Sequence, residues 1–282
     1  MKRAKILVTG STGFVGQQVV KALSLLEVDL CIVVRPEKSN FFGQNTAVKS
    51  TVISNNVFAE SASWWKKQCR DVDIFIHLAW YAEPGKYLDS NYNEQCFSGT
   101  KDMAKGAVEA GVERFIGIGT CFEYQFSESP LDTSSPLDPQ TLYAKMKVNT
   151  FEYLSSYFQE HNVKFLWCRL FYLYGEGEDE RRLVPVIRKN LSEGKIVELT
   201  SGDKVKDYMN IEEAGKIIAN LAVNKHTGAY NVCSGIGTTI KALAEKIADE
   251  YNNGRALLKF GQISRKSYDP PFIVGIKTDK NF

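Results

Sequence analysis

The sequence predicts an α/β fold, in which a doubly wound parallel sheet is followed by a smaller C-terminal α/β lobe. Short apolar runs alternate with helix-like segments through about residue 171, the pattern of a parallel sheet whose strands are joined by helices. The first run is followed by Gly10, Gly13 and Gly16, spaced three apart, and then by a helix-like segment. Such a strand–turn–helix unit brings the backbone close to a pyrophosphate and points free N–H groups at it.

The hydrophobic pattern predicts the elements in chain order. Runs rich in Val, Ile, Leu and Phe predict the strands of the parallel sheet at residues 5–8, 30–34, 48–53, 74–78, 115–118 and 164–171. Helical patterns between them cover residues 17–26, 95–110 and 141–160, and Gly111 stands where a helix C-cap is expected. After a polar loop at 176–182, the pattern predicts helices at 183–191, 212–223 and 239–251 and strands at 196–199, 207–211 and 229–232.

This order of elements predicts two parts. We expect a dinucleotide-binding domain at residues 1–174, with a segment near 205–235 that returns to it. Residues 175–204 and 236–282 are expected to form the smaller lobe, which would bind the substrate.

The glycine turn and the end of the second strand indicate a cofactor. The turn, which also contains Thr12, Phe14 and Val15, has the spacing GxxGxxG rather than GxGxxG. The second strand ends in Arg35, and a guanidinium at this position suits the 2′-phosphate of NADP, whereas an acid would suit the ribose of NAD. NADP(H) is therefore preferred and NAD(H) is possible. The alternatives are a glycine-rich turn without a ligand and a solvated surface Arg35.

Composition excludes several classes of protein. The 282 residues include 35 basic and 33 acidic ones, for a net charge of +2, so no strong field favours nucleic acid or a membrane surface. The sequence shows no apolar stretch long enough to span a bilayer and no signal-peptide core. The six cysteines show no CxxC pair and the three histidines are widely separated, which predicts a reduced, cytoplasmic protein without a metal site.

A second group of residues predicts acid–base chemistry. Tyr143 and Lys147 are four apart in a helical pattern and therefore share one helix face. A lysine ammonium beside a phenol is expected to lower the pKa of the phenol, so that it exchanges a proton with a sugar hydroxyl. Thr120 stands at the C-terminal end of a predicted strand, where open α/β sheets place their ligands. A surface Tyr–Lys pair is the alternative.

With these motifs, the chain resembles the extended short-chain dehydrogenase/reductase family of nucleotide-sugar epimerases, dehydratases and ketoreductases, whose sheet is Rossmann-like. The resemblance implies a catalytic triad of Thr120, Tyr143 and Lys147, and a homodimer that packs through the helices at 95–110 and 141–160. It also implies further contacts with the cofactor by Asn56, Val57, Leu78, Ala79, Trp80 and Phe171, beside those of the turn, Tyr143 and Lys147. The expected contacts with a nucleotide-sugar substrate are Tyr81, Thr120, Cys121, Tyr172, Lys206 and Arg265.

Departures from the family pattern narrow the reaction. The 4,6-dehydratases carry Asp-Glu after the catalytic Thr, whereas this chain has Cys121 and Phe122; Phe122 cannot move a proton, which disfavours water elimination. The family's epimerase/reductases that make fucose nucleotides carry a Cys two positions after the catalytic hydroxyl residue. Here Cys121 follows Thr120 directly, so epimerisation at two carbons is unsupported. The activities that remain are 4-ketoreduction and NAD-dependent 4-epimerisation, and Arg35 favours the NADPH-dependent reduction of a nucleotide-linked 4-keto-6-deoxyhexose. A non-catalytic NADP-binding regulator is the alternative from another class.

Overall fold

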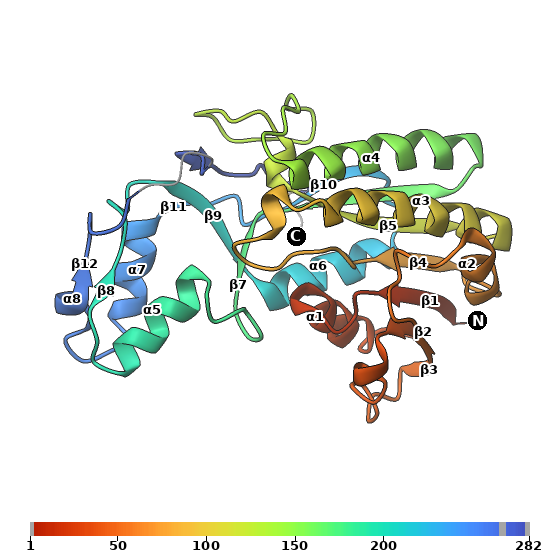
Figure 1. The fold of residues 1–282 in the computed structure, drawn as a ribbon, viewed down its shortest axis with the longest axis horizontal. Coiled ribbons are helices and arrows are strands. Elements are labelled where there is room, and N and C mark those ends of the chain that lie inside the picture. The colour runs from red at the N-terminus through yellow and green to blue at the C-terminus, as the bar shows by residue number, and fades with distance from the viewer. Residues whose placement is uncertain (1–2, 265–268, 280–282) are drawn as a thin grey trace.

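The computed structural model describes residues 3–264 and 269–279 of the chain. Its central sheet has seven strands in the order β10-β6-β5-β4-β1-β2-β3, and every pair of neighbours is parallel (Figure 1). The strand order reverses beside β1, so the carboxyl ends of β1 and its neighbours open a crevice there. The strands are β1 (Ala4–Thr9), β2 (Val28–Val34), β3 (Val48–Ile53), β4 (Ile74–His77), β5 (Arg114–Thr120), β6 (Lys164–Leu170) and β10 (Gly228–Val232).

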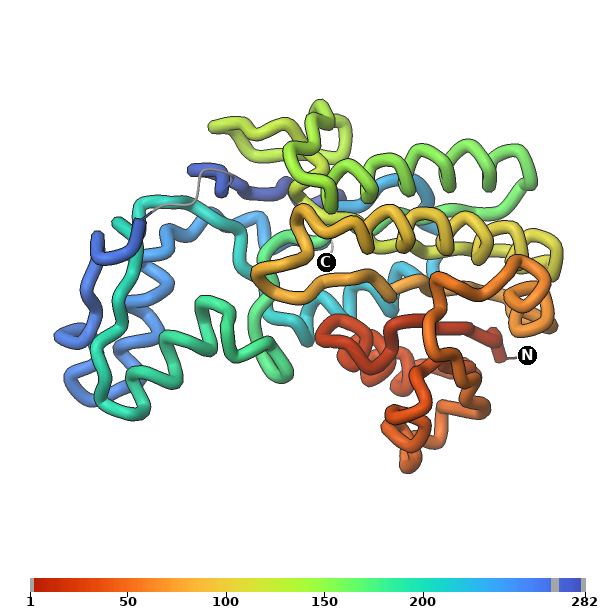
Figure 2. Tube along the Cα trace, viewed as in Figure 1, coloured from red at the N-terminus to blue at the C-terminus, as the bar shows by residue number. Residues whose placement is uncertain are grey.

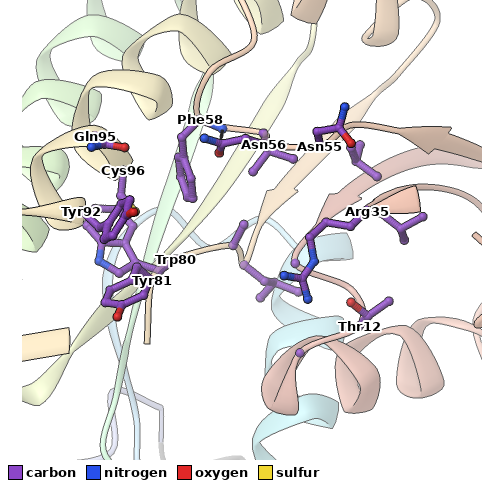
Figure 3. A pocket seen from close by; sticks show the side chains of 17 residues that line it. Thr12, Arg35, Asn55, Asn56, Phe58, Trp80, Tyr81, Tyr92, Gln95 and Cys96 are labelled. Carbon is purple, nitrogen blue, oxygen red and sulfur yellow. Dashed lines mark hydrogen bonds between the residues drawn. The ribbon is translucent and has the colours of Figure 1, made fainter. Parts of the chain in front are cut away.

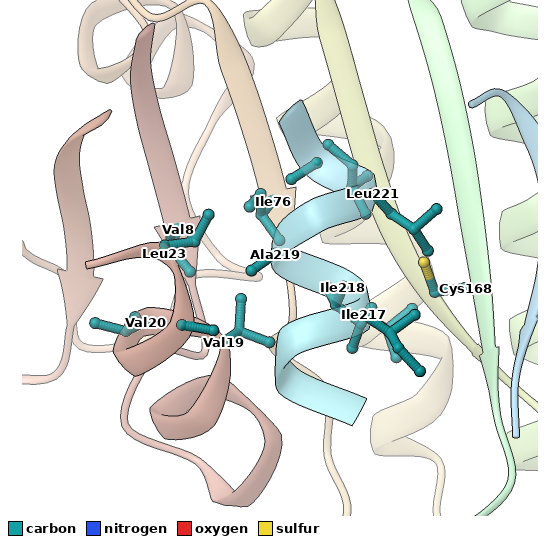
Figure 4. Close-up of a cluster of buried hydrophobic side chains, with 14 of the residues drawn as sticks. Val8, Val19, Val20, Leu23, Ile76, Cys168, Ile217, Ile218, Ala219 and Leu221 are labelled. Atoms are coloured by element: carbon teal, nitrogen blue, oxygen red, sulfur yellow. The ribbon is translucent and has the colours of Figure 1, made fainter. Parts of the chain in front are cut away.

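Helices cover both faces of this sheet. On one face lie α1 (Phe14–Leu23) and α6 (Ile211–Val223), and on the other lie α2 (Ala62–Gln68), α3 (Tyr92–Ala110) and α4 (Leu142–Glu160), as Figures 1 and 2 show. The first face is packed with aliphatic side chains such as Val8, Ile76 and Ile218 (Figure 4). The second is rich in aromatic rings from both sheet and helices. The predicted doubly wound α/β fold is therefore confirmed.

A smaller lobe lies beyond the carboxyl ends of the strands (Figure 1). It contains the helices α5 (Leu183–Ser192), α7 (Ile240–Ala248) and α8 (Gly254–Leu257), the parallel pair β8 (Val197–Glu198) and β12 (Leu258–Lys259), and a hydrophobic core of its own.

A second sheet joins the lobe to the main sheet. In it β9 (Val205–Asn210) pairs with β7 (Tyr172–Tyr174), β11 (Gly237–Thr239) and β13 (Phe272–Ile273). The fully buried carboxylate of Asp207 fixes β9, because it accepts hydrogen bonds from the backbone N–H groups of Ser234, Gly235 and Gly275 and from the Ser234 hydroxyl.

Predicted and observed boundaries differ where tertiary contacts decide them. The strand expected at 164–171 is interrupted, because the Phe171 N–H donates to the carbonyl of Val232 before β7 turns toward the lobe. The 3₁₀ segments Pro36–Lys38, Tyr87–Asp89 and Cys121–Glu123 were not expected. Over the described ranges, no helix has the length and hydropathy needed to cross a membrane.

Helix α4 is one of the two helices through which a homodimer is expected to pack. Leu154 and Phe158 are completely buried against the sheet. Phe151, Tyr153 and Tyr157 remain partly exposed, and the rings of Tyr153 and Tyr157 stack at 5.6 Å. The homodimer stays a prediction, which these three partly exposed aromatic residues support.

Candidate functional site

A cavity of about 420 Å³ opens at the carboxyl ends of β1, β2 and β4 (Figure 3). Its lining brings together ten of the predicted contacts: Gly10, Thr12, Gly13, Arg35, Asn56, Val57, Leu78, Ala79, Trp80 and Tyr81. Residues that sequence reasoning did not name also line it, among them Phe58, Tyr92 and Gln95. Phe14, Val15 and Gly16 form the first turn of α1 behind this lining.

The glycines of the turn are required by close backbone packing. Gly10 has φ +70°, and a Cβ there would stand 2.5 Å from the backbone nitrogen of Ala79. A Cβ on Gly16 would overlap the carbonyl oxygen of Gly10. Helix α1 begins at Gly13 without a side-chain cap, which leaves its first N–H groups for an anion. This cradle fits the pyrophosphate of a dinucleotide.

Arg35 stands at the rim of the cavity. Figure 3 shows its side chain reaching toward the loop that carries Thr12. The side chain is 64% exposed and its Nε lies 3.0 Å from the carboxylate of Glu37, an acid whose pairing with Arg35 the sequence analysis did not foresee. Because exposed ion pairs of this kind are weak, Glu37 leaves the guanidinium available to another anion.

A buried histidine connects the elements that border the crevice. His77 at the end of β4 lies between the hydroxyl oxygens of Thr9, 2.7 Å from Nδ1, and Thr100, 3.0 Å from Nε2. Thr100 donates its proton to the carbonyl of Cys96, so it accepts from Nε2–H, and Nδ1 accepts from Thr9. Burial, together with the charge of Lys147, lowers the pKa of His77 to about 3. His77 is therefore a neutral link between β1, β4 and α3.

The predicted triad converges at the carboxyl end of β5. Helix α4 starts at the N-cap Thr141, whose hydroxyl accepts the N–H of Ala144. This start places Tyr143 in the first turn and Lys147 one turn later. The Lys147 ammonium donates to the carbonyl of Ile118 at 2.6 Å, and the Thr120 side chain favours the ionised form of the Tyr143 phenol. The three side chains are thus brought together at this strand end, with the Lys147 Nζ 5.9 Å from the centroid of the Tyr143 ring.

The pKa expected for Tyr143 is corrected by the structure. The sequence predicted that the Lys147 ammonium would lower it, but burial raises the pKa of the phenol, and the neighbouring Tyr87 and Glu123 raise it further. Burial also lowers the pKa of Lys147 to about 7, which weakens the cation on which the expectation rested. In this structure the phenol holds its proton at neutral pH.

A buried ion pair that the sequence analysis did not name supports Thr120. The carboxylate of Glu123 accepts the Thr120 N–H at 2.8 Å, the indole N–H of Trp167 at 3.1 Å and the Nε–H of Arg169 at 2.7 Å. Both charged side chains are at most 1% exposed. The spacing Thr-x-x-Glu is the signature of a capping box and could have identified Glu123.

The predicted substrate contacts are only partly brought together. Cys121 is buried, which raises the pKa of its thiol to about 12, so it packs as a small apolar residue, close to Phe171 in one cluster. The hydroxyl of Tyr172 is buried without a partner among the described residues, which suits a ligand contact. Lys206 is 1% exposed and donates to Asp269 and Pro270, so its ammonium is engaged within the protein. Arg265 lies outside the described residues.

Comparison with known proteins identifies the class. The chain matches the profile of the NAD dependent epimerase/dehydratase family over residues 6–233. It therefore belongs to this family, whose extended short-chain dehydrogenase/reductase fold the sequence had predicted.

Relatives with assigned reactions span nearly the same length. A dTDP-6-deoxy-L-talose 4-dehydrogenase (NAD(+)) from Aggregatibacter actinomycetemcomitans is 24% identical, covering 96% of this chain and 99% of the relative. A dTDP-4-dehydro-6-deoxyglucose reductase from Escherichia coli is 25% identical, covering 90% and 84%. Among solved structures, the UDP-N-acetylglucosamine 4-epimerase from Methanobrevibacter ruminantium M1, in complex with UDP-N-acetylmuramic acid, superposes with a TM-score of 0.85 at 20% identity, covering 99% and 91% of the two chains.

Proposed function

We propose that the protein reduces the 4-keto group of a nucleotide-linked 4-keto-6-deoxyhexose with NADPH. The observation that carries this proposal is Arg35, which lines the cavity together with the glycine turn and suits the 2′-phosphate of NADPH. The protonation state of Tyr143 is consistent with it. Reduction of a ketone consumes a proton at the carbonyl oxygen, and a buried phenol whose pKa is raised holds such a proton at neutral pH. Oxidation of a hydroxyl would instead need a phenolate at this position.

Each residue of the triad has a part in this reaction. Tyr143 donates its proton to the oxygen that becomes the hydroxyl, and Thr120, at the end of β5 beside the phenol, holds the same oxygen from the other side. Lys147, close by with its ammonium on the Ile118 carbonyl, stabilises the phenolate that remains until a proton returns from solvent. The bound nicotinamide supplies the hydride.

The cavity provides the residues that would hold the cofactor. The glycine turn and the uncapped start of α1 suit the pyrophosphate. Asn56 and Val57 line the same cavity, and we place the adenine beside them. We assign the sugar nucleotide to the smaller lobe and the dinucleotide to residues 1–174 with the returning segment near 205–235. A relative named as a 4-dehydro-6-deoxyglucose reductase supports the substrate class.

The test follows NADPH absorbance after addition of dTDP-4-keto-6-deoxyglucose, with UDP-glucose and no added cofactor as the parallel reaction. We expect one NADPH to be consumed for each keto sugar reduced. Conversion of UDP-glucose to UDP-galactose without keto-sugar-dependent loss of NADPH would identify a 4-epimerase instead. Cofactor binding without turnover of either substrate would favour a regulatory protein.

Cofactor choice is tested at Arg35. If the guanidinium pairs with the 2′-phosphate, Arg35→Ala should weaken NADPH binding by roughly 1.5–3 kcal/mol, the range for hydrogen bonds to charged groups, and leave NADH binding nearly unchanged. Glu37→Gln is the matched control, because it removes the partner of Arg35 and keeps the guanidinium. Calorimetric titration with both cofactors gives the answer. An equal loss for NADPH and NADH would contradict the role of Arg35.

A further inference from the structure

The indole of Trp80 covers the ammonium of Lys147. The Lys147 Nζ lies 3.7 Å from the centroid of the Trp80 ring, a distance at which a cation is attracted to the negative face of the ring. The same Nζ donates to the carbonyl of Ile118 at 2.6 Å, and the side chain is nearly completely buried. Carboxylates among the described residues form no ion pair with it. This buried cation, which has no direct counter-ion among the described residues, therefore has the Ile118 carbonyl and the Trp80 ring as its nearest partners.

A single buried amide locks this indole. The Asn93 side chain accepts the indole N–H of Trp80 at 2.8 Å, and its NH₂ group donates to the carbonyls of Tyr87 at 2.6 Å and Ser90 at 2.8 Å. An indole N–H only donates and a carbonyl only accepts, so only one orientation of the amide satisfies all three bonds. Asn93 is fully buried, which makes a loss of these bonds costly.

The amide also fixes the second neighbour of the triad. Tyr87, whose carbonyl Asn93 binds, packs its ring edge-on against the ring of Tyr143, with 4.8 Å between the centroids. The segments on both sides of the triad, at Trp80 and at Tyr87, are thus tied to the same side chain near the start of α3.

We propose that Trp80, locked by Asn93, is a positioning residue that holds Lys147 in place and favours its charged form. The proposal rests on the proposed function in one respect, the catalytic part given to Lys147. The geometry itself concerns only the protein's own residues.

Other groups also act on this ammonium. Glu123 at the end of β5 and Cys96 on α3 favour the charged form, and burial opposes it. The charge of Lys147 lowers the pKa of His77 on β4. The centroid of the Tyr143 ring on α4 lies 5.9 Å from the Lys147 Nζ. These groups are left unchanged by substitutions at Trp80, so such substitutions isolate the indole.

The experiment titrates Lys147 directly by NMR of protein with ¹³C-labelled lysine, and Lys147→Arg identifies its signal. Trp80→Phe keeps an aromatic face, whereas Trp80→Leu has a similar size and lacks one. Both variants should admit comparable amounts of water to the site. The difference between their Lys147 titration midpoints therefore measures the contribution of the aromatic ring. We expect the midpoint of the Lys147 titration to be lower in Trp80→Leu than in Trp80→Phe by about 0.5–1 pH unit, the size of shift that the loss of a cation–π contact should cause. Equal midpoints would overturn the proposal.

Asn93→Leu tests whether the hydrogen bonds of Asn93 fix the orientation of the Trp80 indole. It should shift the indole N–H signal of Trp80 and lower the Lys147 midpoint in the same direction as Trp80→Leu. The double variant should show no further shift, because both changes remove one interaction. Additive shifts would overturn the lock. If Asn93→Leu does not fold, the Trp80 pair still decides the proposal, since Trp80 is only partly buried. None of these readouts uses turnover, so absence of NADPH oxidation would count against the proposed function alone.

Discussion

Lys147 of the triad and Lys206, which is close enough to Cys121 to lower the pKa of its thiol, are both buried, and their partners differ. Lys147 on α4 and Lys206 on β9 are 3% and 1% exposed. Lys206 forms an ion pair with Asp269 at 2.8 Å, which also binds Lys204 at 2.7 Å. Lys147 has a carbonyl and an aromatic ring instead. A cation paired with a carboxylate keeps its proton and fixes the fold around it, whereas one without such a pair changes its charge easily.

This difference separates a structural region from a chemical one. Burial lowers the pKa of both lysines, and at Lys206 the carboxylate of Asp269 opposes that effect. At Lys147 the pKa falls to about 7, where small changes in surroundings alter the charge. We therefore expect substitutions near Lys147 to change catalysis and substitutions near Lys206 to change stability.

The largest effect is expected at the phenol beside Lys147. Tyr143→Phe keeps the ring and removes the transferable proton, so kcat should fall by about 10²–10⁴-fold, while the urea midpoint stays close to that of the parent protein. The measurement is steady-state NADPH oxidation with a nucleotide-linked 4-keto sugar.

Tyr172→Phe is the matched control for this change, because it removes a buried hydroxyl on the side of Lys206. If Tyr172 contacts the substrate, its loss should raise KM and leave kcat within a few-fold. A normal kcat in Tyr143→Phe would mean that another residue supplies the proton.

The second effect is a loss of stability at the other lysine. Asp269→Asn removes the carboxylate that Lys204 and Lys206 share and leaves two buried ammonium groups with backbone carbonyls but without their counter-charge. Breaking a buried pair costs about 3–5 kcal/mol, and because Asp269 is 31% exposed we expect roughly 2–4 kcal/mol in the free energy of unfolding by urea. The kcat of the folded variant should remain near that of the parent protein.

Lys206→Met in the Asp269→Asn background gives the control. It replaces one unpaired buried cation by an apolar side chain of similar length, so it should restore part of the lost stability. If Asp269→Asn leaves stability unchanged and lowers kcat instead, the Lys206 region belongs to the chemical site and the contrast between the lysines fails.

The sequence predicted the parallel sheet, the glycine turn and the convergence of Thr120, Tyr143 and Lys147, because each follows from a local pattern or from strand ends that must meet at one edge. It could not predict which side chains surround a buried cation. Asp269 lies far along the chain from Lys206, and Trp80, whose indole is hydrogen-bonded to Asn93, lies far along the chain from Lys147. The raised pKa of Tyr143 was missed for the same reason, since burial is set by the whole fold.

The smallest effect expected is a pH dependence of stability that belongs to Lys147. Its pKa is about 7 in the folded protein and has an ordinary value of 10.5, so between these values the unfolded chain binds the extra proton. The free energy of unfolding must then rise with pH above 7, with a slope of at most about 1.4 kcal/mol per pH unit. Lys147→Met lacks this contribution.

Urea unfolding between about pH 6.5 and 7.5 tests this slope, a range in which unfolded cysteines remain mostly protonated. Lys147→Met should be the more stable protein at pH 7, because it buries no charge, and its advantage should shrink as the pH rises. Lys206→Met is the matched control and should keep more of the slope of the parent protein than Lys147→Met does, since the Asp269 carboxylate opposes the lowering of the Lys206 pKa. If the slope disappears in Lys206→Met and persists in Lys147→Met, the lysine that loses its proton near neutral pH is Lys206 and not Lys147.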